Sequence, residues 1–228
     1  MAETGLLLID KPAGITSHDV IDRLRYVTGE KRIGHSGTLD PFATGLLIVG
    51  VGRLSTRELD RFLKMDKAYQ AVLRLGATST TGDKTGEIKQ SNFELTQIPE
   101  NKIREVFNKF LGAQTQIPPM YSAKKVAGKK LYDLARRGQT IERAPVSISI
   151  SSLVLVSYTH PRLTINVHCS SGTYIRTLGE DIGMSLGCGA YVEELTRTAI
   201  GPYQLKDAVK LDMITSNTWK TQLLTLMI

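Results

Sequence analysis

The sequence predicts an α+β fold in which a mixed sheet is covered by peripheral helices. Segments with an apolar period of two and segments with a period near 3.6 both occur in it. They follow one another irregularly, without the strict alternation of strands and helices that is typical of a doubly wound fold. The 228 residues contain no internal repeat, low-complexity tract or long linker, so we expect a single domain over residues 1–228.

The first elements in chain order are a strand and a helix. Residues 5–10 form a short apolar run that a Pro/Gly segment ends, which indicates a buried strand. A helix is expected next, because Thr16 and Asp19 have the spacing of a capping box and Gly29 ends the apolar pattern. The following elements are expected to be an apolar strand at 46–51 and a helix around 56–65.

The rest of the chain continues this mixture. Alternating apolar and polar residues over 67–75 predict a strand. Five apolar residues between 103 and 111 predict an amphipathic helix that Gly112 ends. The later elements are expected to be a hairpin of 146–158 and 163–169, a helix at about 173–186, a strand at 191–200 and one or two packing helices within 201–228.

Composition excludes several classes of protein. Hydrophobic residues make up 41% and charged residues 22%, near ordinary globular values, which argues against wholesale disorder and against a fibrous repeat. The apolar runs are too short for a signal peptide or a membrane span. Two cysteines cannot form a four-ligand zinc site. We therefore expect a cytoplasmic protein with no membrane association, no metal and no cofactor.

Positive charge is concentrated in one segment. The formal net charge is +7, and residues 124–143 hold seven Lys and Arg against two acidic residues, a net of +5. The segment follows Tyr121 and contains Tyr132, a mixture suited to phosphate contact with aromatic support. The alternative is a solvated helix face, which is what a basic run usually forms.

A second concentration of chemistry is the loop at residues 34–45 (GHSGTLDPFATG). It holds one carboxylate, Asp40, and one imidazole, His35. By itself, an Asp before Pro in a glycine-rich loop is usually a turn former, because its side chain bonds nearby backbone amides. The sequence has no P-loop, no strand-linked Gly-x-Gly-x-x-Gly and no Gly-x-Ser-x-Gly elbow, so neither nucleotide hydrolysis nor serine-hydrolase chemistry is supported.

Six segments between residues 6 and 200 stand out when they are taken together. They are LLLIDKPAGITS (6–17), GHSGTLDPFATGLL (34–47), DKAYQAVLRLG (66–76), PPMYSAKKVAGKKLYDLARRG (118–138), CSSGTYIRTLGEDIG (169–183) and GCGAYVEELTRTAI (187–200). In this order they resemble the successive motifs of the TruB family of tRNA pseudouridine synthases. Six motifs in family order are far more specific than any single one.

The resemblance implies a pseudouridine synthase catalytic fold with a mixed, mainly antiparallel sheet. It also implies isomerisation of the T-loop uridine of tRNA, position 55, to pseudouridine. The bond from N1 to the ribose breaks, the uracil turns, and C5 bonds to the same sugar carbon. This reaction needs no redox, energy or metal input. The implied partner is the T-arm of tRNA, without guide RNA, and we expect a monomer.

Three residues match catalytic positions of the family. Asp40 matches the essential aspartate, and it could act as a nucleophile toward the sugar or as a base at its 2′ position; the sequence leaves both open. Tyr69 matches a tyrosine that stacks on the target base, although it could also be a sheet-core residue. Arg176 matches an arginine that pairs with the catalytic aspartate, although by itself it would be interpreted as an exposed residue at a helix start.

Further residues match substrate-binding positions. His35 matches a histidine that holds the flipped-out nucleotides, Lys11 a lysine that supports the catalytic loop, and Leu195 an apolar wall of the pocket. Surface exposure is the alternative for the first two, and core packing for the third. The residues expected to grip the tRNA backbone are Lys124, Lys125, Lys129 and Lys130.

The chain departs from the family pattern in two places. Family members usually continue into an RNA-binding domain of the PUA type, whereas only residues 201–228 follow the last motif, so no PUA domain is expected. Residues 52–56 (GRLST) also differ from the usual Gly-x-Ala-Thr-Lys. Two other functions are compatible with the scaffold: a non-catalytic tRNA-binding or folding protein, and a guide-RNA-dependent enzyme. The Asp40, Tyr69 and Arg176 trio argues against the first, and the missing PUA domain against the second.

Overall fold

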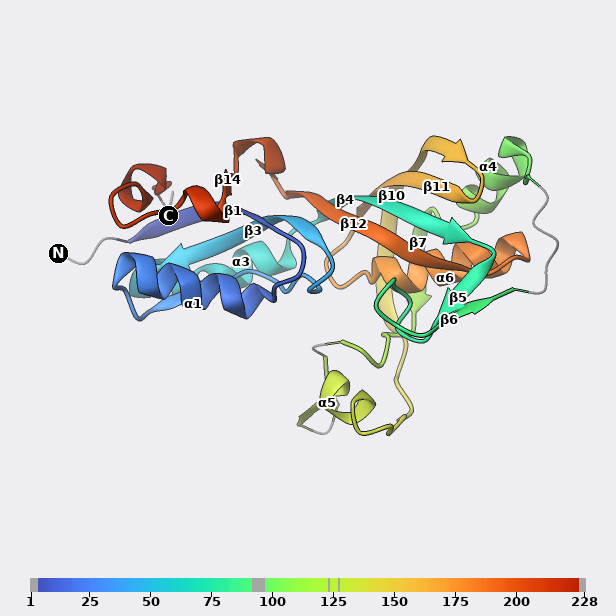
Figure 1. Cartoon of the computed structure of the whole chain (residues 1–228), viewed down its shortest axis with the longest axis horizontal. Helices are drawn as coiled ribbons and strands as arrows, with labels where there is room; N and C mark the ends of the chain where they lie inside the picture. The colour runs from blue at the N-terminus through green and yellow to red at the C-terminus, as the bar shows by residue number, and fades with distance from the viewer. Residues whose placement is uncertain (1–3, 92–96, 123, 127, 226–228) are drawn as a thin grey trace. The chain divides into compact units, whose positions relative to one another are not determined.

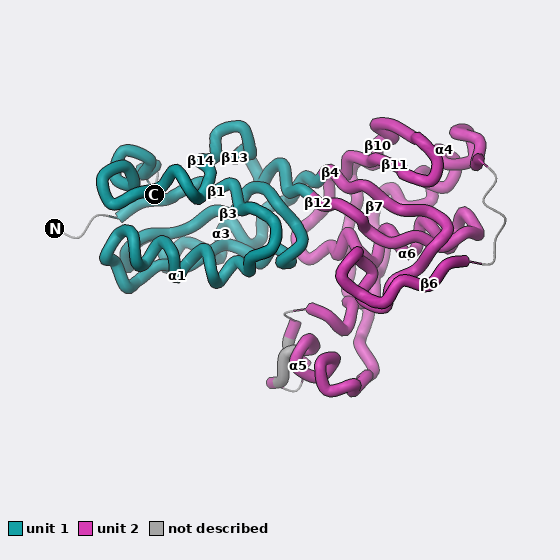
Figure 2. The backbone as a smooth tube through the Cα atoms, viewed as in Figure 1, with its two compact units in different colours: residues 1–69, 196–228 teal, residues 70–195 magenta. Residues whose placement is uncertain are grey.

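The computed structural model of the chain describes residues 4–91, 97–122, 124–126 and 128–225 (Figure 1). Its contacts divide the chain into two compact units, which Figure 2 shows in different colours. Unit 1 comprises residues 1–69 and 196–228, and unit 2 comprises residues 70–195. The single domain over 1–228 stays a prediction, and the two units are described separately below.

Unit 1 is built on a sheet with the strand order β14-β1-β3-β12. Strand β1 is antiparallel to β3, with Gly5 opposite Val51 and Lys11 opposite Gly45, whereas β12 is parallel to β3. The strands of this unit are β1 (Gly5–Lys11), β2 (Ile33–His35), β3 (Thr44–Val51), the end of β12 (Ala190–Ile200), β13 (Tyr203–Gln204) and β14 (Val209–Lys210).

The helices of unit 1 follow the local sequence signals closely. Helix α1 (Ser17–Thr28) has the predicted capping box, in which the Thr16 hydroxyl accepts from the Asp19 amide and the Asp19 carboxylate accepts from the Thr16 amide. Gly29 ends the helix in the left-handed region, at φ 72°. The single helix expected around 56–65 is instead two short helices, α2 (Gly52–Arg57) and α3 (Leu59–Lys64).

The prediction of one or two packing helices within 201–228 is wrong. The described part of this segment forms β13, β14 and three short 3-10 helices, η1 (Leu205–Asp207), η2 (Leu211–Met213) and η3 (Trp219–Gln222). Short turns alternate with pairing to β1: Val209 is paired with Ile9, and Leu224 and Leu6 exchange two bonds of 2.8 and 2.9 Å. The tail therefore completes the edge of the sheet.

Both faces of the β1–β3 pair are buried, which explains why these strands are continuous apolar runs. The odd-numbered residues Leu7, Ile9, Leu47 and Val49 pack with Val20, Ile21 and Leu24 of α1. The even-numbered residues Leu6, Leu8, Leu46 and Ile48 pack with Phe62 of α3 and Ile200 of β12. Lys11 falls on the α1 side of the sheet by the same alternation.

Unit 2 has a sheet with the strand order β12-β4-β11-β10-β7. The predicted hairpin is confirmed, since β10 and β11 are antiparallel with Thr159 opposite Arg162. The strands of this unit are β4 (Lys67–Leu75) from Gln70 onward, β5 (Ala77–Ser79), β6 (Ile88–Gln90), β7 (Gly112–Gln116), β8 (Lys125–Val126), β9 (Lys129–Lys130), β10 (Val146–Thr159), β11 (Arg162–Cys169) and β12 as far as Leu195. Its helices are α4 (Glu100–Asn108), α5 (Leu131–Ala135) and α6 (Ile175–Leu186).

Helix α4 ends earlier than predicted. It stops at Asn108, and Gly112 begins strand β7 at φ 88°. Gly112 is paired with Ile150 of β10, so its backbone belongs to the sheet and not to a helix cap. Phe110 and Leu111 therefore lie in the connection between the two elements.

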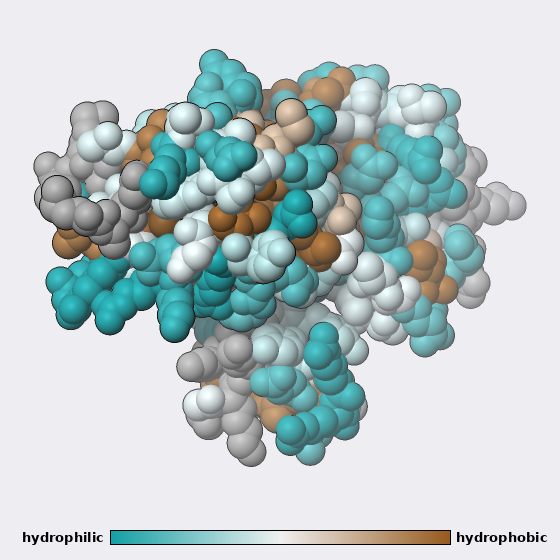
Figure 3. Space-filling model, turned by 60° about the vertical axis from the view of Figure 1, so that its left-hand side comes forward, coloured by the Kyte–Doolittle hydropathy of each residue, from teal (hydrophilic) through white to brown (hydrophobic). Residues whose placement is uncertain are grey.

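Exposed apolar side chains are scattered over the surface. On the face drawn in Figure 3, brown apolar residues are interspersed with a larger number of hydrophilic ones. The large apolar residues with the highest exposure are Tyr26, Met184 and Met213, at 90%, 72% and 65%. Among the helices of the described ranges, none has both the length and the apolar character needed to cross a bilayer.

Candidate active site

In unit 1, the loop that carries Asp40 is anchored on both sides of this residue. On one side, the Ser17 hydroxyl accepts from the Leu39 amide at 2.9 Å and lies 3.3 Å from the Leu39 carbonyl, to which it can donate. On the other side, the Pro41 carbonyl accepts from the Gly14 amide at 2.8 Å. The half-buried Asp40 is therefore held between two residues whose backbones are fixed to the first residue of α1 and to the turn before it.

Lys11 supports the same turn from inside the protein. Its side chain is completely buried, and its ammonium donates to the carbonyls of Pro12 and Ile15 at 2.8 Å each. The Pro41 carbonyl lies at 3.5 Å. Burial lowers the pKa of Lys11 to about 8, while the Asp40 carboxylate acts in the opposite direction. Lys11 thus places a buried cation next to the residue that follows Asp40.

Arg197 of β12 is the second buried cation of unit 1. Its Nε donates to the Leu46 carbonyl at 2.8 Å, and its Nη2 donates to the Gly37 carbonyl at 3.2 Å. The guanidinium also donates a hydrogen bond to the Tyr69 hydroxyl. Burial lowers the pKa of Arg197, and the interaction with Tyr69 opposes this effect. One side chain therefore connects Tyr69 with both ends of the Asp40 loop.

The close approach of β12 and β3 requires a glycine at position 45. Gly45 is opposite Arg197 and has φ 103°. A Cβ at this position would lie 2.4 Å from the Arg197 carbonyl oxygen. Because this oxygen belongs to the backbone, no side-chain rotation could relieve the clash. Beside it, the hydroxyls of Thr44 and Thr196 are hydrogen bonded at 2.8 Å. The register that brings Arg197 to the loop depends on this approach.

His35 lies at the end of β2, where the chain enters the loop. Its side chain is half-buried, and its Nδ1 is buried without a hydrogen-bond partner among the described residues. Burial lowers the pKa of His35, and the nearby charge of Arg197 lowers it further. A buried nitrogen without a partner is uncommon in a folded protein, and a bound ligand is one way to satisfy it.

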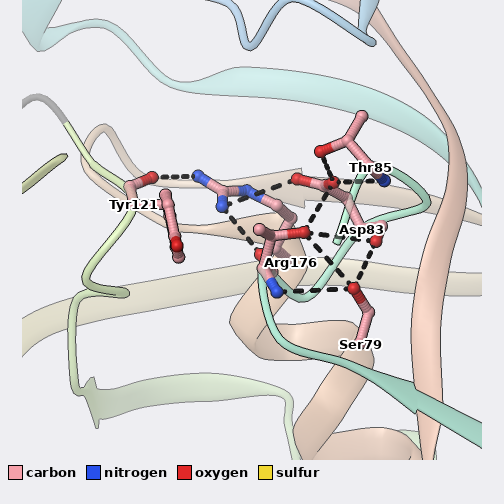
Figure 4. A network of polar contacts seen from close by, with 6 residues as sticks. Ser79, Asp83, Thr85, Tyr121 and Arg176 are labelled. Carbon is pink, nitrogen blue, oxygen red and sulfur yellow. Dashed lines mark hydrogen bonds and ion pairs between the residues drawn. The ribbon is translucent and has the colours of Figure 1, made fainter. Parts of the chain in front are cut away.

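In unit 2, Arg176 at the start of α6 is the centre of a buried polar network (Figure 4). Its guanidinium donates to the Thr81 carbonyl at 2.9 Å and to the Tyr121 carbonyl at 2.6 Å. The Asp83 carboxylate lies 3.6 Å from the same guanidinium, and the two side chains are only 4% and 5% exposed. The interpretation of Arg176 as an exposed residue is therefore wrong.

The loop between β5 and β6 orients Asp83. The other carboxylate oxygen of Asp83 accepts from the Thr81 hydroxyl and from the Thr85 amide, at 2.9 Å each, and from the Thr85 hydroxyl. Ser79 donates to the Asp83 carbonyl. Asp83 thus directs one oxygen at Arg176 while the other is fully occupied by the loop.

Two acidic residues of α6, Glu180 and Asp181, add negative charge to the region around Arg176. Burial raises the pKa of Glu180; the nearby Asp181 and Asp83 raise it further, and Arg176 lowers it. Burial also raises the pKa of Asp181. Arg176 therefore lies near one buried carboxylate, Asp83, and the half-buried Glu180.

The structure places the predicted site residues in both units. Lys11, His35, Asp40 and Tyr69 belong to unit 1, where Arg197 contacts Tyr69 and the loop after His35. Arg176 and the buried Leu195 belong to unit 2. The pairing of Asp40 with Arg176 stays a prediction. Lys124 is half-buried, and the side chains of Lys125, Lys129 and Lys130 lie outside what the structure describes.

Ser17, Asp83 and Arg197 belong to the site although no sequence motif indicated them. A signal for Arg197 was present, because it shares a strand face with Leu195 and Ala199, where a charged residue is unusual. Asp83 lies among Thr and Gly residues in a polar loop, a pattern that is also typical of an ordinary turn. The residues described contain no group of three or more His, Cys, Asp or Glu side chains that could hold a metal ion.

Comparison with known proteins decides the family. Residues 25–175 match the family model described as "TruB family pseudouridylate synthase (N terminal domain)". Residues 176–227 match "tRNA pseudouridylate synthase B C-terminal domain". The chain belongs to the TruB family. The TruB match agrees with the resemblance found in the sequence motifs, and together the two models extend over both compact units.

Curated TruB relatives cover nearly the whole chain. A protein of Burkholderia mallei (strain NCTC 10247) named tRNA pseudouridine synthase B is 45% identical over 214 residues, 94% of this chain and 70% of the relative. A protein of Protochlamydia amoebophila (strain UWE25) with the same name is 48% identical over 207 residues, 90% of this chain and 77% of the relative.

Solved structures support the predicted fold. A chain of a Cbf5-Nop10-Gar1 complex matches with a TM-score of 0.72 at 28% identity, covering 91% of this chain and 52% of that one. A chain of an H/ACA RNP bound to a substrate RNA containing 2′-deoxyuridine matches with a TM-score of 0.69 at 25% identity, covering 95% and 55%. The TruB chain thus spans about half the length of these solved chains. The predicted α+β fold with a mainly antiparallel sheet is confirmed.

Proposed function

We propose that this TruB family protein isomerises the T-loop uridine of tRNA, position 55, to pseudouridine. Relatives at 43–48% identity bear the name tRNA pseudouridine synthase B. The observation that carries the proposal is the anchoring of Leu39 and Pro41, which holds Asp40 from both sides on a loop of the matched family domain. An Asp40 that only formed a turn would not need these contacts on both sides.

The proposed reaction conserves all atoms of the substrate. The bond between N1 of uracil and C1′ of ribose breaks, the base turns, and C5 forms a new bond to C1′. The proton on C5 leaves and N1 gains one, so no oxidant, reductant or other reactant is consumed. Asp40 is the proposed catalytic carboxylate, either as a nucleophile at the sugar or as a base at its 2′ position.

The proposed roles of the neighbouring residues follow from their chemistry. Tyr69 offers an aromatic face for the flipped uracil, and Leu195 offers an apolar wall. Arg176 keeps the catalytic carboxylate ionised and oriented. His35, half-buried at the end of β2, is the proposed contact with the displaced nucleotides. Lys11 supports the Asp40 loop through the turn before α1.

The basic segment 124–143 is proposed to contact the tRNA backbone through Lys124, Lys125, Lys129 and Lys130. Its net charge of +5 supports this role. Around helix α5, the Arg136 guanidinium lies 5.6 Å from the centre of the Tyr132 ring, so cationic and aromatic groups are adjacent there.

We further propose that the protein acts as a monomer in the cytoplasm, on the T-arm of tRNA and without guide RNA. The curated relatives, named for tRNA, are closer in sequence, at 43–48% identity, than the chains of the two solved complexes at 25–28%, one of which is an H/ACA RNP. An activity on a bare T-arm hairpin would distinguish this proposal from a guide-dependent enzyme.

The test is to incubate purified protein with a T-arm hairpin and to map pseudouridine, comparing wild type with Asp40→Asn. We expect product at the T-loop uridine with wild type and none with Asp40→Asn, while both bind the hairpin with similar affinity. Equal product from both proteins would remove Asp40 from the chemistry. Tight binding without product from wild type would favour a non-catalytic tRNA-binding protein.

A further inference from the structure

The strongest unexplained feature of unit 1 is Arg197, an arginine that is only 2% exposed. Burying a guanidinium is costly unless its donors are used. Here the donors are directed at two carbonyls and one hydroxyl: Leu46 at the start of β3, Gly37 in the Asp40 loop, and Tyr69 in β4. These groups lie 128 to 160 positions from Arg197 along the chain, so the contacts exist only in the folded protein.

The contact with Tyr69 also constrains the direction of its hydroxyl. A guanidinium can only donate hydrogen bonds, so the Tyr69 oxygen accepts and its own proton is left for another acceptor. The Tyr69 hydroxyl thus accepts a hydrogen bond from Arg197 and remains able to donate one to another group. The phenol oxygen lies on the axis that runs along the ring from Cγ to Cζ, so holding this oxygen sets where the Tyr69 ring lies.

The contacts with the loop act on the backbone. The Gly37 carbonyl precedes Asp40 by three residues, and the Leu46 carbonyl follows it by six. Arg197 bridges them from β12, whose position is set by the approach to Gly45 and by the bond between Thr44 and Thr196. Arg197 therefore holds the loop at Gly37 and Leu46. Ser17 and Gly14 hold it at the two residues that flank Asp40.

We propose that Arg197 is a positioning residue for pseudouridine formation, which holds the Tyr69 ring and the Asp40 loop in one fixed arrangement. The inference rests on the proposed function, since the roles of Asp40 and Tyr69 come from it. Arg197 itself does not touch the substrate. It acts by setting the geometry of two groups that do, and errors of about 1 Å in such groups can cost roughly 100-fold in rate.

The control is Lys67, another buried cation of unit 1. Its ammonium donates to the carbonyls of Phe62, Leu63 and Met65 at the end of α3. Lys67→Met removes a buried cation and these carbonyl contacts, and it leaves the hydrogen bonds from Arg197 to the Leu46 and Gly37 carbonyls in place. It reports what a loss of packing and stability alone does to the reaction.

The experiment measures three quantities for wild type, Arg197→Lys, Arg197→Met and Lys67→Met. They are the thermal midpoint, the affinity for a T-arm hairpin, and the single-turnover rate of pseudouridine formation with saturating protein. We expect Arg197→Lys to lower the rate by about 10- to 100-fold, with RNA affinity changed less than about threefold. We expect Lys67→Met to keep the wild-type rate at temperatures where it is folded. Arg197→Lys retains a cation and tests the idea even if Arg197→Met does not fold.

A double-mutant cycle with Tyr69→Phe tests whether Arg197 acts through Tyr69. We expect Arg197→Lys to cost a smaller factor in the Tyr69→Phe background than in wild type, because the shared contact is already lost. Equal factors in both backgrounds, or a wild-type rate in Arg197→Lys, would overturn the inference.

A spectroscopic measurement separates this inference from the proposed function. Fluorotyrosine labelling gives eight ¹⁹F resonances, and the one absent in Tyr69→Phe belongs to Tyr69. We expect this resonance to move in Arg197→Lys and not in Lys67→Met. An unmoved resonance would contradict the contact itself, whereas wild-type protein that forms no pseudouridine would contradict the proposed function.

Discussion

Ser17 and Leu39 are joined twice: the Leu39 amide donates to the Ser17 hydroxyl at 2.9 Å, and this hydroxyl lies 3.3 Å from the Leu39 carbonyl. Ser17 is the first residue of α1, and Leu39 immediately precedes Asp40. The helix start therefore serves as the fixed point for the loop that carries the proposed catalytic carboxylate. This relationship leads to the first prediction.

Ser17→Ala is expected to lower both stability and the rate of pseudouridine formation. The buried Leu39 amide loses its partner, which costs about 1–3 kcal/mol in the free energy of unfolding. The loop is then less well held, so the single-turnover rate falls while hairpin affinity is kept.

Thr16→Ala is the matched control. Thr16 caps the same helix, and its loss costs about 1 kcal/mol, but no contact with the loop is removed. Denaturant unfolding and single-turnover kinetics should thus show two destabilised variants of which only Ser17→Ala is slow. Equal rates would mean that the Ser17 contacts do not position Asp40.

Asp83→Asn is expected to weaken the position of Arg176. The change removes the charge that faces the buried guanidinium at 3.6 Å and puts amide hydrogens near it. We expect a loss of about 3 kcal/mol in the free energy of unfolding and a fall of roughly tenfold or more in the single-turnover rate.

Glu100→Gln is its control in the same unit, because the Arg104–Glu100 pair lies at the surface, with both side chains 58% exposed. Little change in stability or rate is expected from it. A full rate in Asp83→Asn would show that Arg176 is held adequately by the Thr81 and Tyr121 carbonyls alone.

Lys11 predicts a pH dependence of stability. Its pKa is about 8 in the folded protein and near 10.5 when unfolded. Between these values the unfolded chain binds more protons, so the Lys11 contribution to the free energy of unfolding rises with pH. Below about pH 8 the penalty for burying the cation is fully present.

Chemical denaturation of wild type and Lys11→Met from pH 7 to 10 measures this effect. The difference in the free energy of unfolding between them should shift in favour of wild type as the pH rises above 8. Titration of ¹³C-labelled lysines should show one resonance with a midpoint near 8 that is absent in Lys11→Met. A constant difference across the range would be inconsistent with the lowered pKa.

RNA affinity is expected to depend steeply on salt. Neutralising Lys124, Lys125, Lys129 and Lys130 should reduce the slope of log affinity against log salt by up to about 3, since each phosphate contact contributes about 0.7 to 0.9. Hairpin binding measured at several salt concentrations gives this slope. The comparison is a variant in which four exposed lysines outside the segment are neutralised: Lys102, Lys109, Lys206 and Lys220. Equal slopes for the two variants would place the RNA path elsewhere.

Local sequence patterns determined much of this protein. The apolar runs of β1 and β3, the capping box of α1 and the alternation in β4 each predict an element within a few residues of its bounds. Such features depend on neighbours at most four positions apart, so they can be recognised without a fold. The six ordered motifs add the family, and with it Asp40 as the candidate carboxylate.

Tertiary structure decided the environment of the site. Arg197 is buried because residues 128 to 160 positions away accept its hydrogen bonds, and Arg176 is buried because Asp83 and the Tyr121 carbonyl meet it. The tail at 201–225 pairs with β1 because a free strand edge satisfies its backbone better than an isolated helix would. These outcomes depend on which distant groups meet in space, and no local period records that.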